Sequence, residues 1–217
     1  MIKLLNKELK LSVPILTWIF LAASIITLFP GYPILVSAFF ICFGIFNSFQ
    51  MGRETNDTLY TALLPIKKSD FVISKYLITC FFQIIGFVFS AIFTAIRMTM
   101  LADAVVYIYN PLMNATPFYL AFVLLIYSAF NIFFIGEFFK TAYNIGIPFL
   151  VFGIVSFLII GIGEVAHYIL GLSFLNVTYG ERLGLQFLIF IVAIVIYILS
   201  TIFSYIISMR KFENVDL

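Results

Sequence analysis

Six long runs of apolar residues, separated by short polar segments, are the feature that most limits how this chain can fold. They cover residues 13–29, 33–49, 71–96, 117–139, 145–162 and 185–208. A helix needs about 20 mostly apolar residues to cross a bilayer. With 64% hydrophobic and only 10% charged residues, a chain of 217 residues cannot bury this surface in one soluble core. The sequence therefore predicts an all-α integral membrane protein with six transmembrane helices in a single transmembrane domain, 1–217.

Positive charge is distributed unevenly over the segments between these runs. If the N-terminus is cytoplasmic, the outer segments hold only Arg97 and Arg182. The inner segments then hold Lys3, Lys7, Lys10, Arg53, Lys67, Lys68, Lys75, Lys140, Arg210 and Lys211. Because Lys and Arg of short loops concentrate on the cytoplasmic side, we predict a multi-pass plasma-membrane protein with both termini inside. The net charge of +2 gives no reason to expect a nucleic-acid partner.

Residues 1–11 precede the first apolar run and have an amphipathic pattern of their own. One face at helical spacing carries Lys3, Asn6, Lys7 and Lys10, and the opposite face carries Ile2, Leu5 and Leu9. We predict an interfacial helix whose lysines face the anionic headgroups of membrane lipid. A basic flank with no helix of its own is the alternative.

The longest inner segment, 50–70, reads QMGRETNDTLYTALLPIKKSD. Asn56 or Asp57 is suited to N-cap a short helix over 58–64, and Pro65 would end that helix. A short helix parallel to the membrane and flanked by charges is the expected form of a docking surface for a cytoplasmic partner. A solvated loop is the alternative.

This segment resembles the cytoplasmic signature of ABC-2-type permeases, the transmembrane subunits of type V ABC exporters. Acidic residues lead into a Leu-Pro pair, a basic pair, an apolar pair and a further lysine. The matching residues are Glu54, Asp57, Leu64, Pro65, Lys67, Lys68, Phe71, Val72 and Lys75. The resemblance implies a bacterial permease of the small peptide or antimicrobial exporter kind, with an N-terminal interfacial helix, six spans, and a coupling helix between the second and third.

The same resemblance implies a half-transporter that works with other chains. Two permeases would pair, as a homodimer or a heterodimer, and each would seat its coupling helix on a cytosolic ABC ATPase subunit. The implied ATPase-coupling interface comprises Glu54, Asp57, Thr58, Leu59, Tyr60, Leu63, Leu64 and Lys67. The chain has no G-x-x-x-x-G-K-[ST] motif. We therefore expect no cofactor in this chain, with ATP and Mg on the partner subunit.

Polar residues recur along the third apolar run at helical spacing. Lys75, Thr79, Gln83, Gly86, Ser90, Thr94 and Arg97 all fall within an arc of about 100°. This polar stripe either lines a translocation path between two permease chains or packs the helix against its neighbours, and we favour packing. Asn131, in the fourth run, is expected to hydrogen-bond a neighbouring helix. Neither interpretation leaves the stripe facing lipid.

The outer segment 163–184 is too apolar for a free loop. We predict a re-entrant outer hairpin before the sixth span, broken near Gly171 and Gly180. His167 and Glu164 together make a poor metal site, so no metal is predicted. The sequence contains no H-E-x-x-H, Cys-x-x-Cys or G-x-S-x-G motif, and we predict no enzymatic activity.

These features favour a permease that moves an amphipathic substrate, such as a peptide, an antimicrobial or a lipid, out of the cell. An ion- or proton-coupled secondary carrier is one alternative, although it requires intramembrane acidic residues that are scarce here. A non-transporting membrane scaffold or immunity protein is the other, because a docking loop and a coupling loop look alike in sequence.

Overall fold

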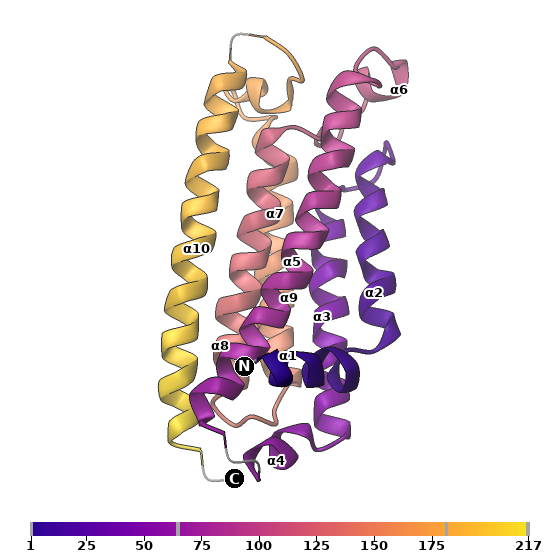
Figure 1. The fold of residues 1–217 in the computed structure, drawn as a ribbon. Helices are drawn as coiled ribbons and strands as arrows, with labels where there is room; N and C mark the ends of the chain where they lie inside the picture. Colours follow the sequence, from indigo (N-terminus) through magenta and orange to yellow (C-terminus); the bar gives the residue numbers. More distant parts are fainter. Residues whose placement is uncertain (1, 64–65, 181, 216–217) are drawn as a thin grey trace.

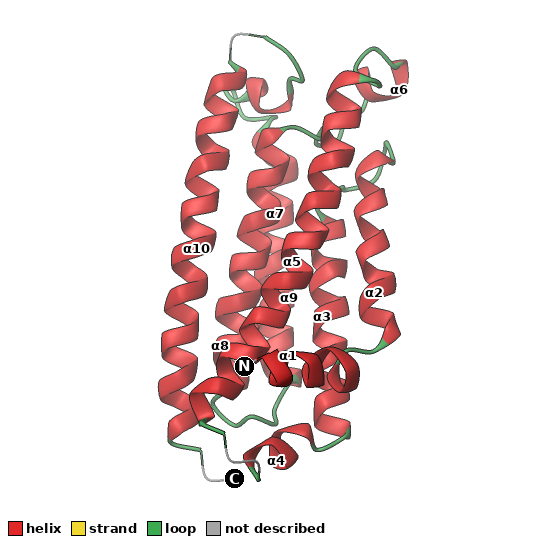
Figure 2. Cartoon of the chain, in the orientation of Figure 1, coloured by secondary structure: helices red, strands yellow, loops and turns green. Residues whose placement is uncertain are grey.

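The computed structural model describes residues 2–63, 66–180 and 182–215. All the regular secondary structure of these residues is helical (Figure 2). The long helices run side by side in one elongated bundle (Figure 1). The predicted all-α architecture is confirmed.

The first half of the chain, in order, is α1 (Ile2–Lys7), η1 (Glu8–Ser12), α2 (Ile15–Leu21), η2 (Ala22–Leu28), α3 (Val36–Glu54), α4 (Asp57–Ala62) and α5 (Lys68–Thr99). The second half is α6 (Val105–Ile108), α7 (Pro117–Ala129), η3 (Phe130–Ile135), α8 (Gly136–Phe138), α9 (Gly146–Ala166), η4 (Ser173–Asn176) and α10 (Leu183–Glu213). The elements η1 and η3 are π-helical turns, and η2 and η4 are 3₁₀-helical. Pro117 opens α7 at a position where its missing N–H costs nothing.

Within the part of the chain that the structure describes, four helices are long and apolar enough to cross a membrane: α5, the continuous stretch Pro117–Phe138, α9 and α10. A fifth crossing is possible if the bent pair Leu4–Ser12 and Ile15–Leu28 counts as one span. Helix α3 runs in the same bundle (Figure 1), but its last turns carry Asn47, Gln50 and Arg53, which make it more polar than the other long helices. The chain is thus a multi-pass membrane protein with four to five candidate spans.

The N-terminal segment does form a helix, α1 continued by η1. It turns by 88° before Ile15–Leu28 begins and lies across the long helices (Figure 1). Val13 and Pro14 are in extended backbone conformations at this bend. Because proline disfavours helical backbone in the residue before it, the bend falls where the sequence requires a break.

The core is built around the stretch Pro117–Phe138. Of its most apolar residues 78% are buried, against 11% for α10, so α10 exposes most of its side chains to the surroundings. Aromatic rings fill the space between α3, η3 and α9: the rings of Phe46 and Phe149 lie 4.1 Å apart, and Phe134 contacts both. Rings of this size supply large contact areas with preferred edge and offset geometries.

Helix α5 packs tightly against the core at Gly86. A Cβ atom there would lie 2.7 Å from Ile41 Cδ1 of α3 and 3.0 Å from the Tyr127 hydroxyl of α7. Ser24 of η2 also donates a hydrogen bond to the Gly86 carbonyl at 3.3 Å. A side chain at this position would have to displace Ile41 or Tyr127, so glycine lets α5 pack closely against α3 and α7 about midway along its length.

The outer segment 163–184 is mostly non-helical between the end of α9 and the start of α10. Its described residues form turns around η4, with left-handed backbone at Gly171 (φ 87°) and Gly180 (φ 117°), the two predicted break points. Side chains satisfy the backbone there: Gln186 donates to the carbonyls of Phe174 and Val177 at 2.7 and 2.9 Å. These carbonyl groups are therefore hydrogen-bonded although they lie outside a helix. The re-entrant hairpin stays a prediction.

Candidate functional site

Two basic and two acidic side chains meet at one end of the bundle. The Lys75 ammonium lies 2.5 Å from Glu8 Oε2 and 3.0 Å from Asp57 Oδ2. Lys7 pairs with Asp57 and lies 3.2 Å from Glu8 Oε1. Glu8, Asp57 and Lys75 are buried, and Lys7 nearly so. We call these four residues the charge cluster; its formal charges cancel.

The charge cluster joins three segments that are distant in sequence. Glu8 comes from η1, Asp57 is the first residue of α4, and Lys75 lies in the first third of α5. Ser12 donates a hydrogen bond to Asp57 at 3.2 Å, and Thr61 accepts one from Lys7 at 2.5 Å. A buried charge is costly unless it is paired and hydrogen-bonded, so each segment depends on the other two.

The cluster keeps Asp57 ionised. Burial opposes ionisation of this carboxyl group, but the attraction of Lys75 and Lys7, with their hydrogen bonds, outweighs it and lowers the pKa of Asp57 below its ordinary value. The Asp57 carboxylate is therefore available to pair with both lysines at neutral pH.

Two details of the sequence prediction are wrong here. Lys7 does not face lipid headgroups, because it is held inside the cluster by Asp57 and Thr61. Neither Asn56 nor Asp57 caps α4 with its side chain. Asn56 adopts left-handed backbone (φ 52°), and the Asp57 carboxylate turns toward two ammonium groups that attract it more strongly than a backbone N–H does.

The other described residues of the predicted coupling interface lie away from the cluster. Leu59, Tyr60 and Leu63 are 50%, 56% and 86% exposed. Glu54 and Lys67 are also exposed, Thr58 is half-buried, and Leu64 lies outside the described residues. Helix α4 and the residue that follows it thus present a largely apolar surface, Leu59, Tyr60 and Leu63, which we call the α4 face. Clustered exposed apolar side chains are typical of surfaces that contact another protein or the membrane.

A cavity of about 250 Å³ lies beside the α4 face, between α4 and the loop after α8. Arg53, Asn56, Leu59, Ala142 and Tyr143 contribute to its lining. Among the described residues other than glycine, Asn56 and Ala142 are the two with left-handed backbone, and both line this cavity. Strained backbone tends to gather at functional sites, where the surrounding structure maintains it.

The polar stripe of α5 faces protein along its whole length. Lys75, Thr79, Gln83, Gly86, Ser90, Thr94 and Arg97 are all buried. At mid-depth, Gln83 and Asn131 of η3 exchange hydrogen bonds, the shorter at 2.9 Å. Tyr197 and Thr201 of α10 bond to this pair at 2.8 and 2.9 Å. Within one chain, the middle of the stripe therefore joins α5, η3 and α10.

Asn131 owes part of its role to the π-helical turn in which it lies. A π-helical turn shifts the regular backbone bonding, and the Asn131 carbonyl accepts a hydrogen bond from Ser204 of α10 at 2.5 Å. Gly136, where η3 ends, likewise accepts one from Lys211 at 3.0 Å. The turn thus fastens α10 to the core by two bonds to main-chain oxygens.

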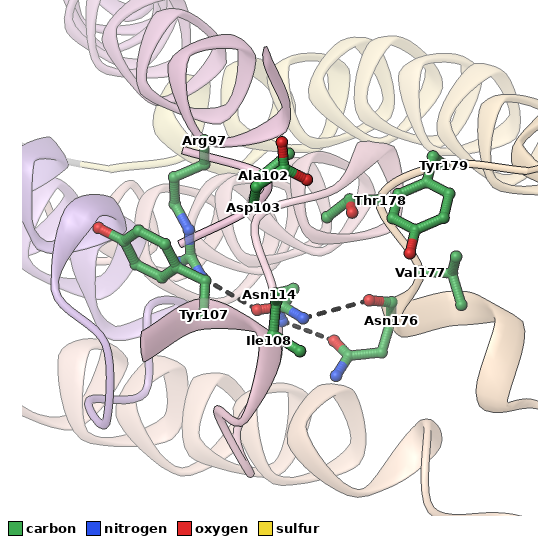
Figure 3. Close-up of a pocket in the computed structure, with 10 residues that line it drawn as sticks. All are labelled: Arg97, Ala102, Asp103, Tyr107, Ile108, Asn114, Asn176, Val177, Thr178 and Tyr179. Carbon is green, nitrogen blue, oxygen red and sulfur yellow. Dashed lines mark hydrogen bonds between the residues drawn. The ribbon is translucent and has the colours of Figure 1, made fainter. Parts of the chain in front are cut away.

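The far end of the stripe reaches a polar pocket of about 220 Å³ (Figure 3). Arg97 donates to the Thr27 carbonyl at 2.9 Å and to Asn114 Oδ1 at 3.0 Å, and its guanidinium lies 4.3 Å from the centre of the Tyr107 ring. Asn114 in turn is held by Asn176, with its N–H 2.6 Å from Asn176 Oδ1. Sequence reasoning identified Arg97 but not the asparagine and tyrosine around it.

The bundle defines the class of the protein: a multi-pass helical membrane protein with a short, partly exposed helix, α4, beyond its long helices. The particular family follows from comparison with known proteins. A family model described as ABC-2 family transporter protein matches residues 3–213. The chain belongs to this family, and the resemblance inferred from residues 54–77 is confirmed. No curated protein and no solved structure matches the chain.

Membership of the ABC-2 family identifies the protein as the permease component of an ABC transporter. This transmembrane component is not itself catalytic. It also implies pairing with an ABC ATPase subunit. The match runs from α1 into the end of α10, so the charge cluster, the α4 face and the Arg97 pocket all lie within it.

Proposed function

We propose that this chain is the permease of a bacterial ABC exporter that moves an amphipathic substrate, a peptide, an antimicrobial or a lipid, out of the cell. ATP and Mg bind to a separate cytosolic ATPase, which docks on the α4 face. A second permease chain, identical or different, completes the membrane domain. The observation that carries the proposal is the attachment of an exposed apolar helix to a long span through a buried charge cluster.

This arrangement suits the transmission of force. Asp57, at the start of α4, is bound to Lys75 of α5, and α5 has 32 residues, a length of about 48 Å. A displacement of α4 by the ATPase would move Lys75, and the packing at Gly86 would make α5 respond as a rigid rod. Glu8 ties the N-terminal helix to the same point, so that α1 and η1 move with it.

The proposal includes six membrane crossings, with α2–η2 and α3 as the two that are less apolar or shorter than the rest. The 88° turn before Ile15 suits an interfacial α1 that lies along the inner surface. Helix α1, helix α4 and the end of α10 lie toward the same end of the bundle (Figure 1). With the basic residues of the short loops, this end would be cytoplasmic in the plasma membrane.

The substrate path would lie between the two permease chains. The polar stripe of α5 is covered by η2, α7, η3 and α10 of its own chain, so in this structure it packs helices. The exposed side chains of α9 and α10 are almost all apolar, which suits an amphipathic substrate that enters sideways from the bilayer.

The first test is purification of the tagged chain from native membranes in mild detergent, followed by mass spectrometry. A stoichiometric cassette ATPase is expected. Replacing Leu59 and Leu63 by serine should release it, because their exposed apolar area forms the contact. The matched control replaces Val105 and Val106, exposed apolar residues of α6 at the opposite end, and should retain it. A chain that emerges alone or with a non-ATPase protein would favour a secondary carrier or a scaffold instead.

Charge reversal at Glu54 and at Asp57 should have different effects, because Glu54 is exposed and Asp57 belongs to the buried charge cluster. Glu54→Lys changes an exposed surface charge and should weaken coupling of ATP hydrolysis to transport without lowering the melting temperature. Asp57→Lys places three ammonium groups around Glu8 and should also loosen α4. Normal coupling in Glu54→Lys at normal expression would remove Glu54 from the interface.

A further inference from the structure

Arg97 is a buried cation, and none of its partners among residues 2–63, 66–180 and 182–215 is an anion. It is 3% exposed and lies two residues before the end of α5. Its hydrogen-bond partners are an amide and a carbonyl oxygen, and the tyrosine ring beside it is neutral. Among the described residues, no ion pair joins it to a carboxylate. These two bonds use two of the five guanidinium N–H donors, which leaves three with no hydrogen-bond partner among the described residues.

The structure tolerates this charge because Arg97 sits in the last turn of a 32-residue helix. Free carbonyl groups at a helix C-terminus favour a cation there. The bonds to Thr27 and Asn114 hold the guanidinium in one orientation. Arg97 is therefore pre-organised and charged before any ligand arrives.

The pocket beside Arg97 offers further polar groups. Figure 3 shows Arg97 and Tyr107 on one side, Thr178 and Tyr179 on the other, and Asn114 between them. The hydroxyl groups of Thr178 and Tyr179 are potential donors to an anion. Asp103 also lines the pocket and is exposed. A buried cation and an exposed anion thus share one cavity.

The surroundings of the pocket are apolar and lie at a membrane boundary. Arg97 is near the end of the candidate span α5. The adjoining helix α6 exposes Val105, Val106 and Ile108 by 66%, 60% and 59%, and Ile108 also lines the pocket. An exposed apolar helix next to a polar cavity fits a ligand with a polar head and an apolar tail.

We propose that this pocket binds the headgroup of a zwitterionic phospholipid that carries a primary amine, of the phosphatidylethanolamine type. The phosphate lies on Arg97, because a guanidinium matches phosphate oxygens in a two-pronged arrangement. The ammonium group lies on Asp103, which would repel a headgroup that is only anionic. The acyl chains lie along α6.

Binding is tested on the purified, delipidated full-length chain in detergent, without the ATPase, so the result does not depend on coupling. Phosphatidylethanolamine, phosphatidylcholine and phosphatidylglycerol are added as mixed micelles, and affinity is measured by thermal shift and native mass spectrometry. We expect the ethanolamine lipid to bind most tightly. The choline headgroup has no N–H to donate to Asp103, and the glycerol headgroup has no cation.

Two substitutions test which residue binds the phosphate and which binds the ammonium group of the headgroup. Arg97→Gln should weaken binding of all three lipids by about 10- to 100-fold, the usual value of a charge-assisted hydrogen bond. Asp103→Asn should weaken only the ethanolamine lipid, by about 2- to 5-fold, and so remove the selectivity. Asp103 is exposed, so this variant is expected to fold even if Arg97→Gln does not. Arg182→Gln is the matched control, an exposed arginine before α10, and should bind as the parent does.

The outcomes separate the possibilities. Equal affinity of the parent for all three lipids, or selectivity that survives in Asp103→Asn, would overturn the proposal. Soluble glycerophosphoethanolamine is included as a probe. If it binds as tightly as the lipid, the pocket recognises soluble phosphate esters and the role of α6 is wrong.

Discussion

The two ends of α5 handle positive charge in opposite ways. At one end Lys75 contacts two carboxylates, and Lys7 completes a cluster whose charges cancel. At the other end Arg97 is equally buried, but its partners are neutral oxygens and an aromatic ring. We call the Lys75 end of α5, where the charges balance, the closed end. We call the Arg97 end, where neutral groups surround the cation, the open end.

This difference indicates different tasks. A cluster with both signs present has no charge left for a ligand, and its contribution is to hold η1, α4 and α5 in one arrangement. A cation with spare N–H donors beside a cavity retains the capacity to bind an anion. Coupling at one end and recognition at the other would then be connected by one rigid helix.

The largest effect is expected from breaking the closed end. Lys75→Met leaves Glu8 and Asp57 buried beside each other with only Lys7 to pair them. It should lower the free energy of unfolding by about 3–5 kcal/mol. The loss should exceed that of Arg97→Gln, whose neighbours remain neutral. Thermal unfolding in detergent measures both, and Lys140→Met, at an exposed lysine, is the control. Similar losses in the two variants would show that the ends do not differ.

An intermediate effect is expected midway between the two ends. Gly86→Ala places a methyl group 2.7 Å from Ile41 Cδ1 and should cost about 1–3 kcal/mol through overpacking. Gly153→Ala in α9 meets nothing within 4 Å and should be neutral or stabilising. Unfolding of the two variants under identical conditions is the comparison. A harmless Gly86→Ala would mean that α5 is not clamped there, and the rigid connection between its ends would be lost.

The smallest effect is expected from pH. The pKa of Asp57 is lowered in the folded protein, so its contribution to stability is present above the unfolded value of about 3.9 and is lost as pH falls through the lower folded value. The stability difference between the parent and Asp57→Asn should therefore be constant from pH 8 to pH 5 and shrink below pH 4. A difference that already shrinks near pH 6 would contradict the ion pairing assigned to Asp57.

Several features followed from local patterns alone. Helical periodicity placed six polar residues and Gly86 on one face of α5, and all seven are buried. The basic amphipathic pattern predicted a helix before Leu11, and α1 with η1 is there. The spacing of Asp57 and Pro65 predicted a short helix, and α4 begins at Asp57. Such features depend on neighbours within one or two turns, which the sequence displays directly.

Glu8 shows what those patterns missed. It lies between the two faces of the predicted amphipathic helix and gave no signal beyond being the one acidic residue among lysines. Its importance comes from Lys75, 67 positions away, and from the π-helical turn that presents it. The caps expected of Asn56 and Asp57 failed for a related reason, since a local bond competes with distant charges that the sequence does not locate.

The sequence by itself determined that this chain spans a membrane, which residues share one face of a helix, and which family the chain resembles. These features could be predicted because hydrophobicity and helical period are properties of nearby residues. The tertiary structure alone decided which charges meet. Lys75 and Arg97 look alike in sequence, each a basic residue near the end of one apolar run. Packing brings two carboxylates to Lys75 and neutral oxygens to Arg97, because contacts across the bundle depend on how the helices pack and on where they bend.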